Sequence, residues 1–113
     1  MNYKITPTED FERNFKRLFK KYPSLKNDMK DFLKELRKNP EMGDDLGSNT
    51  RKIRMAIASK NKGKRGGARV ITCNVLINTA IAKIYLLTIY DKGERKSISK
   101  KEINYLKDLN GLL

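Results

Sequence analysis

Apolar residues recur at helical spacing in two stretches of the first forty residues, and turn and capping signals bound each stretch. Thr6-Pro7-Thr8-Glu9 resembles a capping box, with Thr6 as N-cap and Pro7 at the first helical position. Tyr22-Pro23-Ser24 ends this helix and caps a second one, which stops at Asn39-Pro40. The two apolar stripes are Phe11, Phe15, Leu18, Phe19 and Tyr22, and then Leu25, Met29, Phe32, Leu33 and Leu36. The pattern predicts a helical hairpin that needs an apolar partner layer.

Alternation with a period of two replaces the helical period after residue 50. Ile53 and Met55 alternate with Lys52 and Arg54, which predicts a strand over residues 51–58 with both cations on one face. Residues 41–50 contain Gly and Asp without a period and are predicted to form a loop. Further strands are expected over residues 3–5, 68–76 and 80–90, with a hairpin turn at 77–79. The run at 80–90 is apolar at nearly every position, which is typical of a central strand.

A second capping-box pattern, formed by Ser99 and Glu102, predicts a C-terminal helix with Ile103, Leu106 and Leu109 on its apolar side. The 113 residues contain no internal repeat and suffice for one modest core. We therefore predict a single α+β domain over residues 1–113. It consists of a short N-terminal strand, a helical hairpin packed on a small, mainly antiparallel sheet, and a C-terminal helix.

The segment from Arg51 to Arg69 holds eight Lys or Arg residues and no Asp or Glu. Residues 59–67, here called the basic loop, have lost the apolar period and are rich in Lys, Arg and Gly, so we expect a mobile connection between strands. Arg69 opens the next strand, and antiparallel pairing would bring it close to Arg54. These cations form a candidate phosphate site, although the same pattern also suits the solvated face of a half-exposed sheet.

The charge of the whole chain points to a polyanionic partner. The net charge is +13 and the isoelectric point is about 10.0, a balance that favours nucleic acid. Residues 1–50 carry 11 basic against 9 acidic side chains, whereas residues 51–113 carry 15 against 4. The chain has one cysteine, Cys73, and no histidine, which excludes an internal disulfide and disfavours a zinc site. No segment has the length and apolarity of a signal peptide or membrane span, so we expect a cytoplasmic protein.

Three motifs in this order resemble the RelE/ParE superfamily of bacterial toxins, and most closely its HigB/RelE branch. They are K-I-R-M-A at residues 52–56, G-K-R-G-G-A-R-V-I at residues 63–71 and I-Y-L-L-T-I-Y-D-K-G-E-R-K-S-I-S at residues 84–99. The resemblance implies a type II toxin that inhibits translation by cutting messenger RNA in the decoding site of the ribosome. It further implies inhibition by a cognate antitoxin and a reaction without metal or cofactor. In that reaction the RNA 2′-hydroxyl attacks the adjacent phosphate, and the protein supplies positioning, proton transfer and charge stabilisation.

The resemblance also assigns roles to particular residues. With no histidine available, we interpret Lys52 as the base, since neighbouring cations lower a lysine pKa. Arg54 and Arg69 are interpreted as clamps that bind the phosphate and stabilise the transition state. Lys92 and Arg95 are the candidates for the cation that acts as acid or stabilises the leaving oxygen. The residues expected to bind RNA outside the reaction centre are Arg51, Lys60, Lys62, Lys64, Arg65 and Tyr90. Several family members place a Tyr where this chain has Ser99, so either Tyr90 or Tyr105 replaces it in stacking or the residue is dispensable.

Two other functions remain open from the sequence. One is a toxin of the same fold that poisons DNA gyrase and cleaves no RNA. The other is a nonenzymatic RNA-binding module in which the cations only grip phosphates. The density of cations in the predicted strand and loop favours the nuclease.

Overall fold

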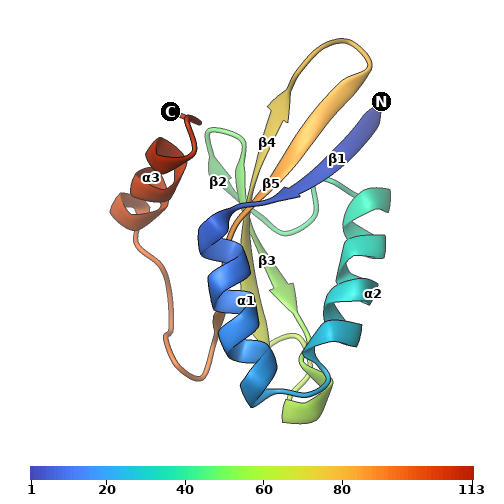
Figure 1. The fold of residues 1–113 in the computed structure, drawn as a ribbon, viewed down its shortest axis with the longest axis vertical. Helices are drawn as coiled ribbons and strands as arrows, with labels where there is room; N and C mark the ends of the chain where they lie inside the picture. Colours follow the sequence, from blue (N-terminus) through green and yellow to red (C-terminus); the bar gives the residue numbers. More distant parts are fainter.

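The computed structural model describes residues 1–113 as a five-stranded sheet with two helices against one face and a third helix against the other (Figure 1). Chain order is β1 (Asn2–Pro7), α1 (Glu9–Lys21), α2 (Leu25–Lys38), β2 (Asp44–Gly47), β3 (Thr50–Met55), the 3₁₀ helix η1 (Ala58–Lys60), β4 (Ala68–Leu76), β5 (Ile81–Asp91) and α3 (Lys100–Leu109). The strands lie in the order β1-β5-β4-β3-β2. Only β1 and β5 pair in parallel, so the predicted α+β fold with a mainly antiparallel sheet is confirmed.

The two faces of the sheet bury separate apolar clusters, because successive side chains of a strand point to opposite sides. Ala68 and Val70 of β4 contribute to a large cluster with the stripes of α1 and α2. Ile71 and Cys73 of the same strand pack instead in a smaller cluster with Ile103 of α3. The helical hairpin thus covers one face along much of its length, while α3 leaves part of the other face open (Figure 1).

The first helix begins two residues later than the capping pattern predicted. Pro7 ends β1, and Thr8 rather than Thr6 is the N-cap, since its hydroxyl accepts a hydrogen bond from the Phe11 amide. The same buried hydroxyl lies 2.9 and 3.0 Å from the carbonyl oxygens of Leu86 and Leu87 on β5. Pairing of β1 with the central strand therefore overrode the local preference of Pro7 for a first helical turn.

The other predicted helix boundaries agree with the structure more closely. α2 has Ser24 at its N-cap position, although the Ser24 side chain makes no capping bond, and it stops at Asn39 as predicted. Ser99 caps α3 by accepting a hydrogen bond from the Glu102 amide. The Glu102 carboxylate pairs with Arg95. None of the three helices has the length and apolar character needed to cross a membrane.

Two predictions for residues 41–60 were wrong. The expected loop contains the edge strand β2, which pairs with β3 through a tight turn at Ser48 and Asn49, both with positive φ. Its residues are all exposed, so the strand has no apolar alternation that would have revealed it. The strand predicted over residues 51–58 ends at Met55, and η1 follows.

Candidate active site

A row of side chains crosses three neighbouring strands on the face that α3 leaves partly open. Arg54 of β3 is directly opposite Arg69 of β4, and Arg69 is directly opposite Tyr90 of β5. Side chains paired in this way share a face of the sheet. Lys52 lies two residues before Arg54 and therefore on the same face. The predicted approach of Arg69 to Arg54 is confirmed.

Arg69 is a buried cation whose partners are carbonyl groups. Its side chain is 5% exposed, and its guanidinium donates hydrogen bonds to the carbonyl oxygens of Lys64, Arg65 and Ala68 at 2.9–3.2 Å. These bonds use three of the five N–H groups of a guanidinium. Burial, followed by the positive charge of Arg54, lowers the pKa of Arg69. The negative charge of a phosphate bound beside Arg69 would raise that pKa again.

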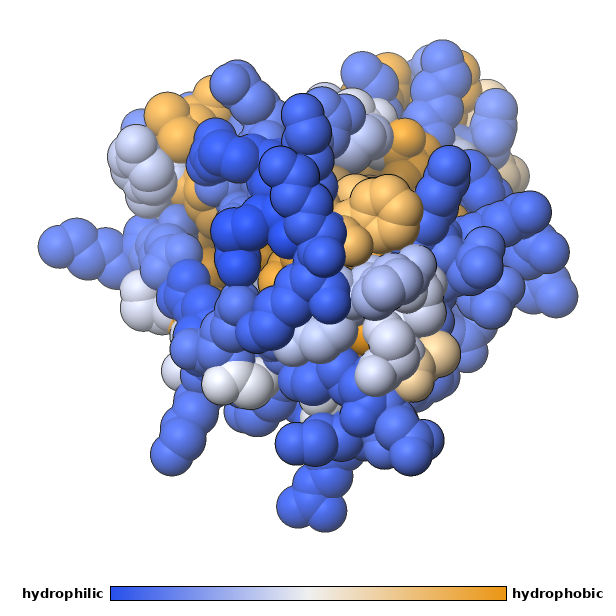
Figure 2. Space-filling model, turned by 60° about the horizontal axis from the view of Figure 1, so that its bottom comes forward, coloured by the Kyte–Doolittle hydropathy of each residue, from blue (hydrophilic) through white to orange (hydrophobic).

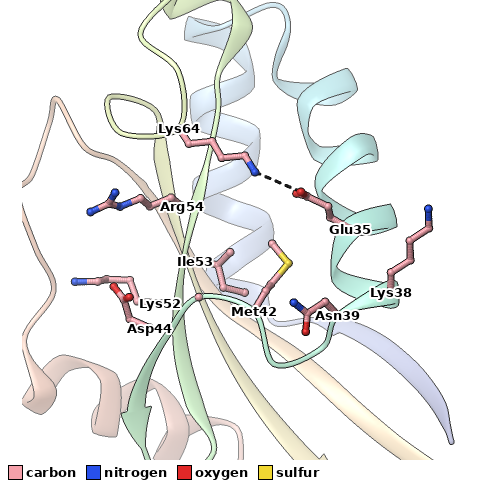
Figure 3. A pocket seen from close by; sticks show the side chains of 10 residues that line it. Glu35, Lys38, Asn39, Met42, Asp44, Lys52, Ile53, Arg54 and Lys64 are labelled. Carbon is pink, nitrogen blue, oxygen red and sulfur yellow. Dashed lines mark hydrogen bonds and ion pairs between the residues drawn. The ribbon is translucent and has the colours of Figure 1, made fainter.

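Lys52 and Arg54 extend from β3 toward the same side, away from α2, while Glu35 and Lys38 lie across from them on the helix (Figure 3). Together these residues line an open hollow of about 520 Å³ along the edge of β3. Arg54 is exposed and Lys52 partly buried, and neither makes an ion pair within 4 Å. Both side chains are therefore available to a substrate.

Asp44 is a site residue that the sequence interpretation missed. It lies opposite Lys52 in the β2–β3 ladder and lines the same hollow (Figure 3). Its negative charge is felt as far as Arg69, whose pKa it raises slightly against the larger effects of burial and Arg54. The signal that could have found it is Gly47-Ser48-Asn49, a turn sequence that folds residue 44 back onto residue 52.

Lys92, just beyond the end of β5, completes the group that we call the cation cluster: Lys52, Arg54, Arg69 and Lys92. Partial burial lowers the pKa of Lys92, and the positive charges of Arg69 and Lys52 lower it further, with smaller contributions from Lys96 and Arg54. Its ammonium group donates to the Lys96 carbonyl at 2.7 Å. A lysine with a lowered pKa releases its proton more readily than an ordinary one, which suits a general acid.

Arg95 lies over the ring of Tyr90 and, although exposed, is engaged by Glu102, so the two residues do not take the positions that the predicted roles require. Both N–H groups of the Arg95 fork bind the Glu102 carboxylate, at 2.9 and 3.1 Å, and its guanidinium lies 5.3 Å from the centre of the Tyr90 ring. The Tyr90 side chain is 4% exposed. A base cannot stack on a ring covered in this way, so the expected stacking role of Tyr90 does not fit the structure. Tyr105 on α3 is exposed instead.

Lys60 also turns inward, contrary to the prediction that it binds RNA. Its ammonium group donates to the carboxylate of Asp91 at 2.6 Å, and Asp91 is 1% exposed. The same carboxylate accepts hydrogen bonds from the Tyr22 hydroxyl and the Gly93 amide. Burial raises the pKa of Asp91, but the bonds from Lys60, Tyr22 and Gly93 outweigh it and hold that pKa below its usual value. A carboxylate this deeply buried needs a cation, and Lys60 supplies it.

The remaining predicted RNA contacts divide between two faces. Arg51 lies on the face opposite Lys52, where its guanidinium approaches Asp45 at 3.8 Å, so it does not join the cation cluster. Lys62, Lys64 and Arg65 are exposed on the basic loop, and Lys64 makes an exposed ion pair with Glu35 at 3.3 Å (Figure 3). Hydrophilic residues cover most of the molecular face that includes the lower end of Figure 1 (Figure 2).

The basic loop is tied to the cation cluster at its far end. The Gly67 carbonyl accepts a hydrogen bond from the Lys92 amide at 3.0 Å, and a Cβ atom at residue 67 would lie only 2.1 Å from the Met55 carbonyl oxygen. Only glycine permits this approach. No group of three or more His, Cys, Asp or Glu side chains comes together in a way that would hold a metal ion.

Residues 11–113, nearly the whole chain, match the family model described as the RelE toxin of the RelE/RelB toxin–antitoxin system. The fold, with a helical hairpin on one face of the sheet and a terminal helix on the other, is consistent with that architecture. The match implies an antitoxin as binding partner. The chain therefore belongs to the RelE toxin family and is a toxin of a toxin–antitoxin system.

Proposed function

We propose that this protein is a ribosome-dependent mRNA endoribonuclease of the HigB/RelE kind, which inhibits translation in the cytoplasm and is held inactive by its antitoxin. The observation that supports the proposal is the cation cluster. Arg54 and Arg69 face the same side of the sheet as Lys52, and Lys92 is close enough for their charges to lower its pKa. Holding like charges close together costs free energy because they repel each other. Such clusters are typical of sites that bind a polyanion or stabilise negative charge in a transition state.

The proposed reaction uses a nucleophile that belongs to the RNA. Arg54 and Arg69 bind the non-bridging oxygens of the scissile phosphate and orient it for attack by the 2′-hydroxyl. Lys52 accepts the proton of that hydroxyl. A bond forms between the 2′-oxygen and phosphorus, the bond from phosphorus to the 5′-oxygen breaks, and Lys92 donates a proton to the leaving oxygen. The products are a 2′,3′-cyclic phosphate and a free 5′-hydroxyl.

The cluster does not account for cleavage by itself, because an enzyme of this kind also needs its substrate held in place. The ribosome would perform that task by presenting the message in a fixed conformation. Lys62, Lys64 and Arg65 on the basic loop would bind the RNA backbone without reading its sequence.

The test is to add the purified protein to ribosomes that carry a defined message, in the presence of chelator, and to map RNA ends by primer extension. Free message is treated in parallel. We expect one cut in the decoding site on ribosomes, lost in Lys52→Ala and in Arg54→Ala but kept in Lys26→Ala, an exposed control on α2.

Two outcomes would overturn the proposal. One is inhibition of gyrase supercoiling by the same preparation while ribosome-bound message stays intact, which would identify a gyrase poison. The other is intact message together with RNA affinity that declines gradually as each cation is removed, which would identify a plain binder. In the nuclease, Lys52→Ala abolishes cutting and leaves affinity nearly unchanged.

A further inference from the structure

A second hollow, of about 330 Å³, lies between the β2–β3 turn and α3. Its lining differs from that of the hollow along the edge of β3, which contains Glu35 and Asp44, because no acidic residue contributes to it. Its lining includes Leu46, Ser48, Ile98, Lys100, Asn104 and Lys107.

Lys107 is a buried cation without a carboxylate partner. Its side chain is 4% exposed, and its ammonium group donates to the Ser48 carbonyl and the Thr50 hydroxyl, each at 3.1 Å. No Asp or Glu oxygen lies within 4 Å of it. An ammonium group has three donors, so one N–H remains. A buried charge is expensive unless it is paired, and an anion in the adjoining hollow would pair it.

The rest of the lining suits an anion joined to a partly apolar group. Ile98 and Leu46 provide apolar walls, while Asn104 is exposed and offers both amide donors and an amide acceptor. Lys100, also exposed, adds a second cation. Apolar surface against which a ring can pack, an amide that can bind the ring's edge, and cations for a phosphate together match the chemistry of a nucleotide.

The hollow is next to the cation cluster. Thr50, which holds Lys107, lies on the same face of β3 as Lys52, and two residues along a strand span about 7 Å. On its other side the hollow includes Ile98, which follows the Lys92–Ser97 segment. A strand of RNA whose phosphate rests on Lys52 and Arg54 would place a neighbouring nucleotide here.

We propose that this hollow is a nucleotide subsite, in which Lys107 and Lys100 attract the phosphate and Asn104 contacts the base. The source of the nucleotide, a residue of the substrate RNA beside the cut, rests on the proposed function. A free nucleoside monophosphate has the same chemistry and is the alternative source. Asn104 is then a specificity-determining residue for the base at that position.

The test measures binding without cleavage, so that its failure is distinct from failure of the proposed nuclease activity. Isotope-labelled protein is titrated with 2′-deoxy trinucleotides, which cannot be cut by 2′-hydroxyl attack, and separately with nucleoside monophosphates. We expect the amide resonances of Ser48 and Asn104 to shift with the trinucleotide. Lys107→Met should weaken its affinity about tenfold or more, because a hydrogen-bonded charge is lost.

Lys107 is buried, so its replacement could disturb folding, whereas the exposed Asn104 can be replaced without that effect. Asn104→Ala should reduce the difference in affinity among trinucleotides that differ in base. Lys101→Ala, an exposed residue of α3 that does not line the hollow, should leave affinity for the trinucleotides within about twofold of wild type. Stronger binding of monophosphates than of trinucleotides would overturn the RNA source. Unchanged affinity in both Lys107→Met and Asn104→Ala, or shifts confined to other residues, would overturn the subsite.

Discussion

Arg69 is held by carbonyl groups, and this arrangement leaves its positive charge uncompensated. Three backbone oxygens fix the guanidinium plane, yet they neutralise none of its charge, and Arg54 lies directly opposite. A fixed, dehydrated cation of this kind stabilises negative charge on a phosphate without having to reorganise. The geometry of the guanidinium, and not only its charge, should therefore affect the rate of cleavage.

Arg69→Lys tests this point because it keeps the charge and loses the planar fork. We expect the single-turnover rate of message cleavage on ribosomes to fall about 10²-fold or more, while ribosome binding changes much less. Lys62→Arg on the exposed loop is the matched control for exchanging the two cations. A rate within threefold of wild type would mean that the fork is not used.

The lowered pKa of Lys92 gives a pH signature. As general acid, Lys92 must be protonated, so activity should decline as the pH rises through its pKa, at a lower pH than for an ordinary lysine near 10.4. Lys92→Arg keeps the cation protonated throughout, so the decline at high pH should disappear along with most of the rate. The measurement is the pH dependence of single-turnover cleavage on ribosomes whose integrity is verified at each pH. A Lys92→Arg profile identical in shape to wild type would exclude Lys92 as the acid.

At the scale of elements, the basic loop is fastened at both ends. Lys60 anchors its start to Asp91 at the end of β5, and Gly67 binds the Lys92 amide at its finish. The Arg69 guanidinium binds two carbonyls in between. The loop was predicted to be mobile, but these contacts fasten it to Arg69 and to the end of β5. Asp91, which binds Lys60, provides one of the contacts with β5.

Asp91→Asn should therefore destabilise the fold. Removing one member of a buried pair leaves Lys60 uncompensated, and we expect a loss of about 3 kcal/mol in the free energy of unfolding at neutral pH, measured by urea denaturation. Glu94→Gln, which breaks the more exposed pairs with Arg17 and Lys21, should cost less than about 1 kcal/mol.

The pH dependence of that loss has a definite sign. Because the pKa of Asp91 is lowered in the folded protein, its stabilisation is present above the pKa of an unfolded Asp, about 3.9, and disappears as the pH falls through the folded value. The difference between wild type and Asp91→Asn should shrink in acid. A difference that is equal at pH 7 and at pH 3 would contradict this account.

Sequence patterns predicted those elements whose boundaries depend on local signals. Most of each helical stripe, the turn after Leu76 and the Ser99 cap follow from residues close together in the chain, and they agree with the structure. Phe19 and Leu109 were predicted on apolar stripes but are exposed. β2 was missed because an exposed edge strand has no apolar alternation. The start of α1 shifted because pairing with β5, distant in the sequence, extended β1 through Pro7.

The candidate site likewise has features that follow from local sequence patterns and features that depend on the folded structure. Strand alternation predicted that Lys52 and Arg54 share a face, and antiparallel pairing predicted the approach of Arg69. The inward turn of Lys60 and the covering of Tyr90 by Arg95 depend on partners 31 and 5 positions away, whose side chains meet only in the folded protein. No local pattern encodes such pairs.

In the whole molecule, the two faces of the sheet have different roles. One face packs against α1 and α2 to form the larger core, and the other, only partly covered by α3, presents the cation cluster. The net charge of +13 adds a long-range attraction for polyanions, among them the RNA of the proposed function. In the proposed function, the cation cluster acts on RNA in direct contact and the net charge acts on it at longer range.

Salt should separate these two effects. Affinity for single-stranded RNA is expected to fall as salt rises, with a logarithmic slope of about −0.7 for each phosphate contact. The double variant Lys62→Ala/Arg65→Ala, on the exposed loop, should make the slope shallower by about 1.4. The exposed α2 pair Lys26→Ala/Lys30→Ala serves as control. Equal slopes in wild type and the loop variant would remove the basic loop from the RNA interface.

If the cation cluster promotes attack by the RNA's own 2′-hydroxyl, replacing that hydroxyl must abolish the cut. Ribosomes are programmed with a message that carries one 2′-deoxynucleotide immediately 5′ of the cut found in the unmodified message. We expect no cut at this position, and a 2′,3′-cyclic phosphate on the upstream fragment of the unmodified message. Cleavage of the deoxy-substituted message at the unmodified rate would contradict the account.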